Sequence, residues 1–107
     1  MSESNPEQTL ADIEAAFETS KAERMKAKHR LESAKGRYHT QLVARREAGE
    51  KLTVSDIKAL EASAIDDVKE IRAAYLEFID ADTVYRQRKV AFEAAKRDYW
   101  DSRPTIR

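Results

Sequence analysis

The chain has 107 residues, a hydrophobic fraction of 41% and a formal net charge of zero, so it has material for a thin apolar seam rather than a thick core. Ala, Glu, Arg, Lys and Leu make up 55 of the 107 residues, a composition typical of long helices and coiled coils. Without cysteine or a long apolar run, the sequence excludes disulfides, cysteine-based zinc sites and a membrane-spanning helix, and we expect a cytoplasmic all-α protein.

The first predicted helix runs from about residue 6 to 48. Asn5 as the N-cap and Pro6 at the first helical position predict its start. Gly49 predicts its end, because glycine adopts the positive φ that often follows a helix without strain. Apolar and small residues recur at a spacing of three and four, which predicts a seam with Met25 and Leu42 beside it. The predicted seam positions are Leu10, Ile13, Phe17, Ser20, Arg24, Ala27, Leu31, Ala34, Tyr38 and Gln41.

A turn over residues 49–53 leads to the second predicted helix, from about 54 to 102. Thr53 followed by Asp56 indicates a capping box, in which each side chain accepts a hydrogen bond from the other residue's backbone. No glycine or proline interrupts the residues from Leu52 to Arg103, so we expect one continuous helix. Its predicted seam positions are Ile57, Leu60, Ala64, Val68, Ile71, Tyr75, Phe78, Asp82, Tyr85, Lys89, Phe92, Lys96 and Tyr99.

Charge is distributed in four blocks along the chain. Residues 1–20 carry a net −5, residues 21–46 carry +7, residues 47–82 carry −6 and residues 83–107 carry +4. Folding about Gly49, so that position i faces about 102 − i, opposes these blocks in sign. The same fold places Leu42 near Leu60, Leu31 near Ile71, Phe17 near Tyr85 and Leu10 near Phe92. The prediction is an antiparallel two-helix coiled-coil hairpin that forms a single domain over residues 1–107.

The second helix carries apolar residues beside its main seam. Ile65, Leu76 and Ile79 widen the apolar surface beyond what one facing helix covers. We expect them to bind a partner, either another protein or a second copy in a four-helix arrangement, although scattered surface aliphatics are an alternative reading. Trp100, one position off the seam, is a further candidate anchor for a partner.

No constellation of residues indicates catalysis or metal binding. His29 and His39 lack a carboxylate or second histidine at metal-ligand spacing. No glycine-rich phosphate loop and no serine beside a plausible base occurs either. We therefore expect no enzyme activity, no cofactor, no metal and no small-molecule substrate.

Two functions remain as hypotheses. The first is a non-enzymatic protein-interaction module, such as an adaptor, small regulatory subunit, chaperone or inhibitor. The alternative is a nucleic-acid-binding accessory protein that uses the basic stretch of the first helix to contact phosphates, although the facing acidic block and zero net charge oppose it. The candidate nucleic-acid-binding residues are Lys21, Arg24, Lys28, Lys35, Arg45 and Arg46.

Overall fold

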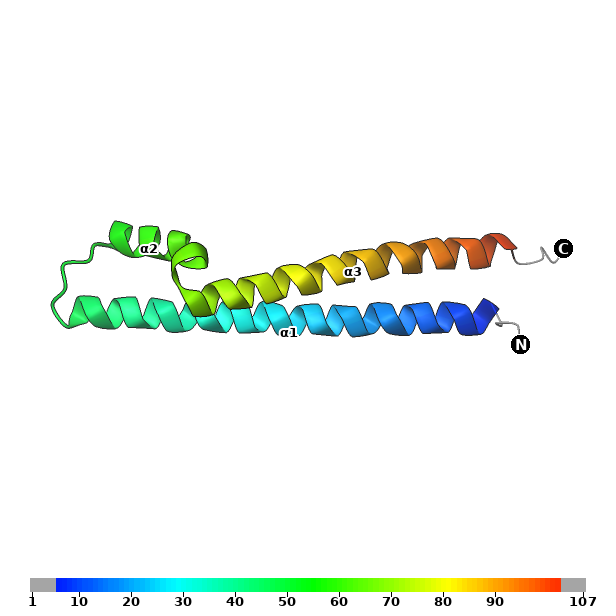
Figure 1. Cartoon of the computed structure of the whole chain (residues 1–107), viewed down its shortest axis with the longest axis horizontal. Coiled ribbons are helices and arrows are strands. Elements are labelled where there is room, and N and C mark those ends of the chain that lie inside the picture. The colour runs from blue at the N-terminus through cyan, green and yellow to red at the C-terminus, as the bar shows by residue number, and fades with distance from the viewer. Residues whose placement is uncertain (1–5, 103–107) are drawn as a thin grey trace. The chain divides into compact units, whose positions relative to one another are not determined.

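The structure of the protein is a computed structural model that describes residues 6–102, of which 93% lie in helices, with no strand among them. The helices are α1 (Pro6–Glu47), α2 (Val54–Asp67) and α3 (Lys69–Ser102), shown in Figure 1. The all-α prediction is confirmed. The predicted N-cap Asn5 and the stop before Pro104 lie outside the described residues.

The chain packs as two compact units. Among the described residues, unit 1 combines residues 6–24 with residues 81–102, and unit 2 consists of residues 25–80. Both units therefore contain a segment of α1 and a segment of α3, whereas α2 belongs to unit 2 alone.

Gly49 ends α1 as predicted. The backbone N–H of Glu50 donates to the carbonyl of Arg45 at 3.1 Å, and that of Gly49 donates to the carbonyl of Arg46 at 3.1 Å. This pair of hydrogen bonds is a Schellman motif, which needs a left-handed residue at its centre, and Gly49 has a φ of +105°. The motif satisfies carbonyls that the end of α1 would otherwise leave without donors.

The predicted capping box at the start of α2 is also confirmed. The backbone N–H of Asp56 donates to Thr53 Oγ1 at 3.0 Å, and the backbone N–H of Thr53 donates to Asp56 Oδ2 at 2.9 Å. Because the hydrogen bond from the Thr53 backbone favours the charged carboxylate, the pKa of Asp56 is lowered. This local signal fixes the start of α2 at Val54.

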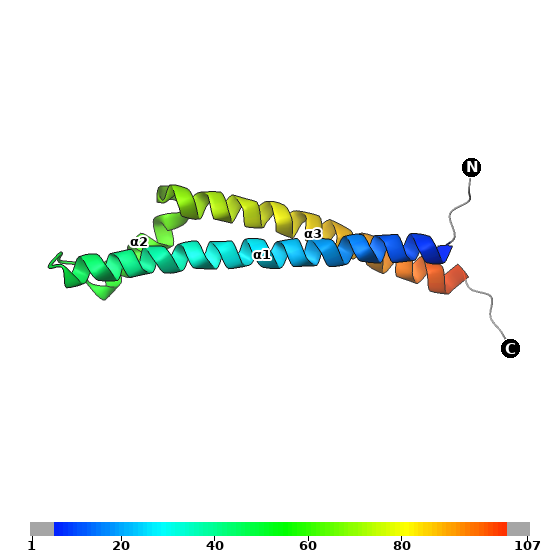
Figure 2. The same cartoon turned by 90° about the horizontal axis from the view of Figure 1, so that it is seen from below.

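The expected single helix over residues 54–102 is wrong, because the chain breaks at Val68. This residue is extended, with φ −104° and ψ 110°, and the chain changes direction there (Figure 2). Its N–H still donates to the carbonyl of Ala64, and its carbonyl accepts from Arg72. A new helix, α3, starts after the break. Glu70 lies in its first turn, where a negative charge interacts favourably with the positive end of the helix dipole.

The core of unit 2 lies where α1 meets both other helices. Leu31 and Ala34 of α1 cluster with Ala64 of α2 and Ile71 of α3, and all four are buried. Since residues on either side of the break pack against the same turn of α1, the end of α2 and the start of α3 overlap along it. The break therefore takes up chain length and shifts the register of α3.

Ion pairs show how large this shift is. Arg30 pairs with Glu77 and Arg37 pairs with Glu70, so α1 and α3 run in opposite directions in unit 2. In both pairs the residue numbers add up to 107, whereas for His39 and Glu61 on α2 they add up to 100. The predicted sum of 102 is close for α2 and is wrong by about five residues for the part of α3 in unit 2.

Aromatic packing holds unit 1 together. The predicted contact between Phe17 and Tyr85 is present, with ring centroids 5.6 Å apart and an angle of 27°. Phe92, expected near Leu10, stacks on the same Phe17 ring with centroids 5.3 Å apart. Phe17 thus lies between two aromatic rings that are seven residues apart on α3.

The three-four spacing identifies most of the shielded side chains of α1. Ser20, Ala27, Leu31 and Ala34 are buried at predicted seam positions, and Leu10, Ile13, Phe17, Arg24 and Tyr38 are partly buried. The last predicted position is wrong, because Gln41 is exposed and its neighbour Leu42 is fully buried.

Gly36 lies in the middle of α1 with open space around it. A Cβ added there meets no atom within 4 Å, so close approach of another helix does not explain this glycine. We expect Gly36→Ala to raise the free energy of unfolding by about 0.5–1 kcal/mol, because alanine restricts the unfolded backbone. Gly49→Ala is the matched control and should lower it, because Gly49 has a positive φ. Urea unfolding measures both, and a destabilised Gly36→Ala protein would contradict the prediction.

Candidate functional site

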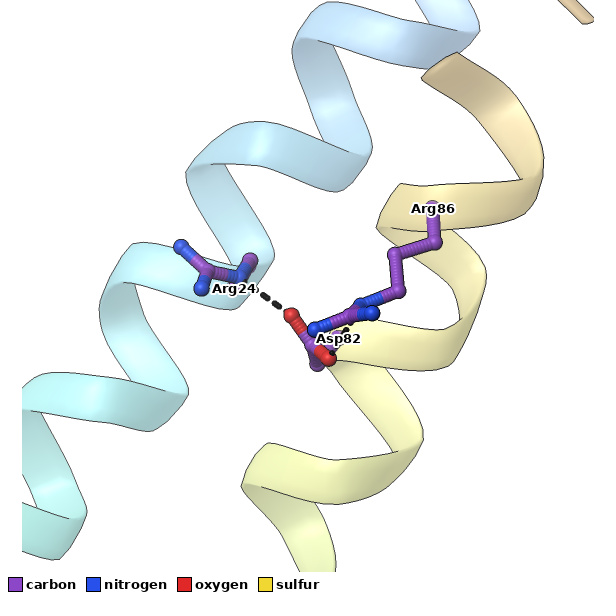
Figure 3. A network of polar contacts seen from close by, with 3 residues as sticks. All are labelled: Arg24, Asp82 and Arg86. Carbon is purple, nitrogen blue, oxygen red and sulfur yellow. Dashed lines mark hydrogen bonds and ion pairs between the residues drawn. The ribbon is translucent and has the colours of Figure 1, made fainter. Parts of the chain in front are cut away.

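A charged network crosses the seam of unit 1. The Nε of Arg24 on α1 donates to Asp82 Oδ1 on α3 at 2.7 Å, and the Nε of Arg86 donates to Asp82 Oδ2 at 2.8 Å (Figure 3). The Arg24 guanidinium also lies 5.1 Å from the centre of the Tyr85 ring. Because Asp82 accepts from both arginines and its side chain is only 16% exposed, the network fixes the local register of the two helices.

The same network sets the protonation of Asp82. The hydrogen bond from Arg24 holds the pKa of the Asp82 carboxyl below its ordinary value, and this effect exceeds the opposing effect of partial burial. Arg86 lowers the pKa further. The carboxylate is therefore charged throughout the neutral range and into mild acid.

Asp82→Asn should destabilise the protein in a pH-dependent manner. Because the pKa of Asp82 is lowered on folding, the carboxylate contributes its full stability above the ordinary value of about 4. This contribution is lost as the pH falls through the lowered value in the folded state. We expect the difference in Tm between wild type and variant to be largest near pH 7 and to shrink towards pH 2. Asp80→Asn, at an exposed neighbour, is the control, and an unchanging difference for Asp82→Asn would contradict the linkage.

Two grooves flank the seam of unit 2. The first, which we call the basic groove, has a volume of about 510 Å³. The buried residues Ala64 and Ile71 line this groove, together with several charged or polar side chains. Among these, the Nδ1 atom of His39 forms a hydrogen bond with the carboxylate of Glu61. The lining residues are Lys35, Gly36, Tyr38, His39, Lys58, Glu61, Ala62, Ala64 and Ile71.

The second groove, which we call the paired groove, has a volume of about 490 Å³. Arg30 and Arg37 of α1 line it together with Glu77 and Glu70 of α3, and these four residues form two ion pairs. Positive and negative charges thus balance in the paired groove. In the basic groove, Lys35 and Lys58 exceed the single carboxylate of Glu61.

The predicted partner-binding residues differ in exposure. In unit 2, Leu76 is 51% exposed and Ile79 is 39% exposed, whereas Ile65 is partly buried against the core cluster. In unit 1, Trp100 is 59% exposed, and its ring packs edge-to-face with that of Tyr99, with centroids 5.6 Å apart. Leu76 and Ile79 therefore provide exposed apolar surface in unit 2, and Ile65 belongs largely to its core.

The predicted nucleic-acid-binding residues differ in whether they form ion pairs within the chain. Arg24 pairs with Asp82, and Arg45 pairs with Glu50 at 2.9 Å. Over the described part of the chain, the other four are exposed and form no ion pair: Lys21, Lys28, Lys35 and Arg46. Lys35 lines the basic groove together with Lys58 of α2.

The sequence patterns do not identify Lys58 as a site residue. Lys58 reaches the basic groove because α2 lies beside α1. The one available signal is that α2 ends in Asp66 and Asp67, since acidic residues are unfavourable at the negative end of a helix dipole.

Metal binding, membrane insertion and similarity to known proteins assign no function to the chain. Among residues 6–102, no group of three or more His, Asp or Glu side chains lies together in a way that would hold a metal ion. None of the helices described is both long and apolar enough to cross a membrane. Comparison with protein-family models, curated proteins and solved structures finds no match.

Proposed function

We propose that the chain is a non-enzymatic protein-interaction module, built as an antiparallel coiled-coil hairpin from α1 and the α2–α3 pair. Ion pairs of unit 2 and stacked rings of unit 1 both join α1 to α3, which supports the hairpin. The three-four spacing of shielded residues on α1 supports the coiled coil. Its partner is another protein or a second copy of the chain.

The observation that carries the proposal is exposed apolar surface on α3 in unit 2. Leu76 and Ile79 are three residues apart, so they lie on the same side of α3, and they are 51% and 39% exposed. Neither position belongs to the three-four stripe of Ile71, Tyr75 and Phe78. A partner helix that covers them would gain about 25 cal/mol for each Å² of apolar surface removed from water.

Affinity capture with a matched control tests the proposal. Wild type and Leu76→Ser/Ile79→Ser would each be used as bait in an extract of the native host, next to Val54→Ser. Val54 is equally apolar and 56% exposed, but it lies at the start of α2. We expect the wild type and Val54→Ser to retain the same protein, including untagged copies of the chain, and the double variant to lose it. Identical retention by all three baits would overturn the proposal.

Nucleic-acid binding is the second candidate, because Lys21, Lys28 and Lys35 are exposed at intervals of seven residues on α1. Such a row could contact phosphates. The pairing of Arg24 and Arg45 with carboxylates removes two of the predicted contacts. Titration with duplex and single-stranded nucleic acid at two salt concentrations tests this candidate, and binding that does not depend on salt would exclude the phosphate contacts.

A further inference from the structure

The two helices that pack on α1 in unit 2 have registers that differ by seven residues. His39 pairs with Glu61 of α2, and these residue numbers add up to 100. Arg37 pairs with Glu70 of α3, and these numbers add up to 107. Seven residues make almost two full turns, so both registers turn nearly the same faces of the helices towards each other. An uninterrupted helix over α2 and α3 can follow only one of the two registers.

Different interactions fix the two registers. The turn fixes that of α2, because the Schellman motif at Gly49 and the capping box of Thr53 and Asp56 end one helix and start the next. The last residue of α1 and the first residue of α2, 47 and 54, accordingly add up to 101. Ion pairs such as that between Arg30 and Glu77 fix the register of α3. The caps and the ion pairs thus require different registers, and the break between α2 and α3 accommodates both.

Val68, at the break, retains the hydrogen bonds of a helical residue. Its N–H donates to the carbonyl of Ala64 at 2.8 Å, and its carbonyl accepts from the N–H of Arg72 at 2.8 Å, which is the i to i−4 spacing of an α-helix. Val68 also continues the three-four stripe between Ala64 and Ile71. In the broken form, α2 ends in two aspartates, which are unfavourable at the negative end of a helix dipole. Joining the two helices therefore requires a change at Val68 rather than refolding of either helix.

The joined helix can keep the register of α3 if α2 slides along α1. A slide of seven residues, about 10 Å, brings α2 to the sum of 107. Glu61 then leaves His39 and lies level with Arg46, which is seven residues further along nearly the same face of α1. Arg46 is exposed and, among the described residues, forms no ion pair. The slide draws the turn past the end of α1, so its cost is the loss of the caps.

We propose that unit 2 is a two-state switch, in which α2 slides by seven residues along α1 and joins α3 in one helix. In the broken state, which is the one described above, the caps of the turn are formed and Val68 is extended. In the joined state, Val68 is helical, Glu61 lies level with Arg46 and the caps are lost. A partner that binds one state more tightly shifts the balance towards it. The switch goes beyond the proposed protein-binding function, because it does not depend on the class of that partner.

Pairs of introduced cysteines test the switch in the full chain, which has no cysteine of its own. His39→Cys/Glu61→Cys reports the broken state and Arg46→Cys/Glu61→Cys reports the joined state, each through its rate of reaction with a short thiol crosslinker. With the native turn, we expect the first pair to react faster. Thr53→Ala/Asp56→Ala, which we call the capless variant, removes the capping box and should raise the rate of the second pair about tenfold. An unchanged rate for the second pair overturns the switch.

Two controls show whether the effect comes from the caps and from sliding of α2 alone. Ser55→Ala changes an exposed residue between the two capping residues and should leave the rates of both cysteine pairs unchanged. Arg30→Cys/Glu77→Cys reports the register of α3 and should react at the same rate with the native turn and in the capless variant. Circular dichroism checks that every variant is helical. A change in the rate of this α3 pair would overturn the proposal, because α3 would then also have moved.

Substitutions of Val68 distinguish the joined helix from a turn that has merely frayed. Val68→Ala and Val68→Gly both remove the valine side chain, but alanine favours a helical backbone over glycine. In the capless variant, we expect the pair at residues 46 and 61 to react about fivefold faster with alanine than with glycine. A frayed turn brings the same cysteines together without a helix at Val68, so equal rates for alanine and glycine would overturn the proposal. The capture experiment with Leu76→Ser/Ile79→Ser tests the proposed function independently of these rates.

Discussion

Replacing Leu42 with alanine is expected to lower the free energy of unfolding by about 2–5 kcal/mol. Leu42 is the most completely buried large side chain of α1, with an exposed fraction of 0%. The substitution removes apolar atoms from a packed site and leaves a cavity, and the loss is larger when the neighbours cannot collapse into it. Since the total stability of a domain of this size is about 5–15 kcal/mol, the change should be visible in a single urea titration.

Leu76→Ala is the matched control for Leu42→Ala. It removes the same atoms from a side chain that is 51% exposed, and it should cost less than about 1 kcal/mol when measured on the monomer. Equal effects at the two positions would show that Leu42 is not packed as described.

The local signals of the sequence predict the end of α1 and the start of α2 correctly because short-range hydrogen bonds determine them. Gly49 provides a positive φ, and Thr53 and Asp56 complete a capping box within four residues. The break at Val68 has no such signal, since neither glycine nor proline is nearby. Ala64 and Ile71, on either side of the break, share a buried cluster with Leu31 and Ala34 of α1, and these contacts join residues far apart in the sequence.

The candidate site is less predictable than the helices for the same reason. The sequence identifies the basic stretch of α1, but it does not show which bases meet a carboxylate. A shift of about five residues in register decides that Arg37 pairs with Glu70. Charge blocks give the orientation of two helices, whereas individual pairs require the register.

Phe17→Ala is expected to destabilise unit 1 by about 2–4 kcal/mol. The substitution removes a ring that stacks on both Tyr85 and Phe92, with centroids 5.6 Å and 5.3 Å away. Burial of the ring contributes most of this effect, and each aromatic pair adds about 0.5–1.5 kcal/mol. Chemical denaturation followed by circular dichroism measures the total loss.

Phe17→Leu separates burial from ring stacking, and hydrogen exchange locates the effect in the chain. Leucine keeps apolar volume between Tyr85 and Phe92 but forms no ring pair, so its cost should lie between those of wild type and alanine. Because the chain packs as two units, we expect amides near Tyr85 and Phe92 to exchange faster in Phe17→Ala, while amides near Ile71 keep their rates. Equal acceleration throughout the helices would instead mean that the two units unfold as one cooperative structure.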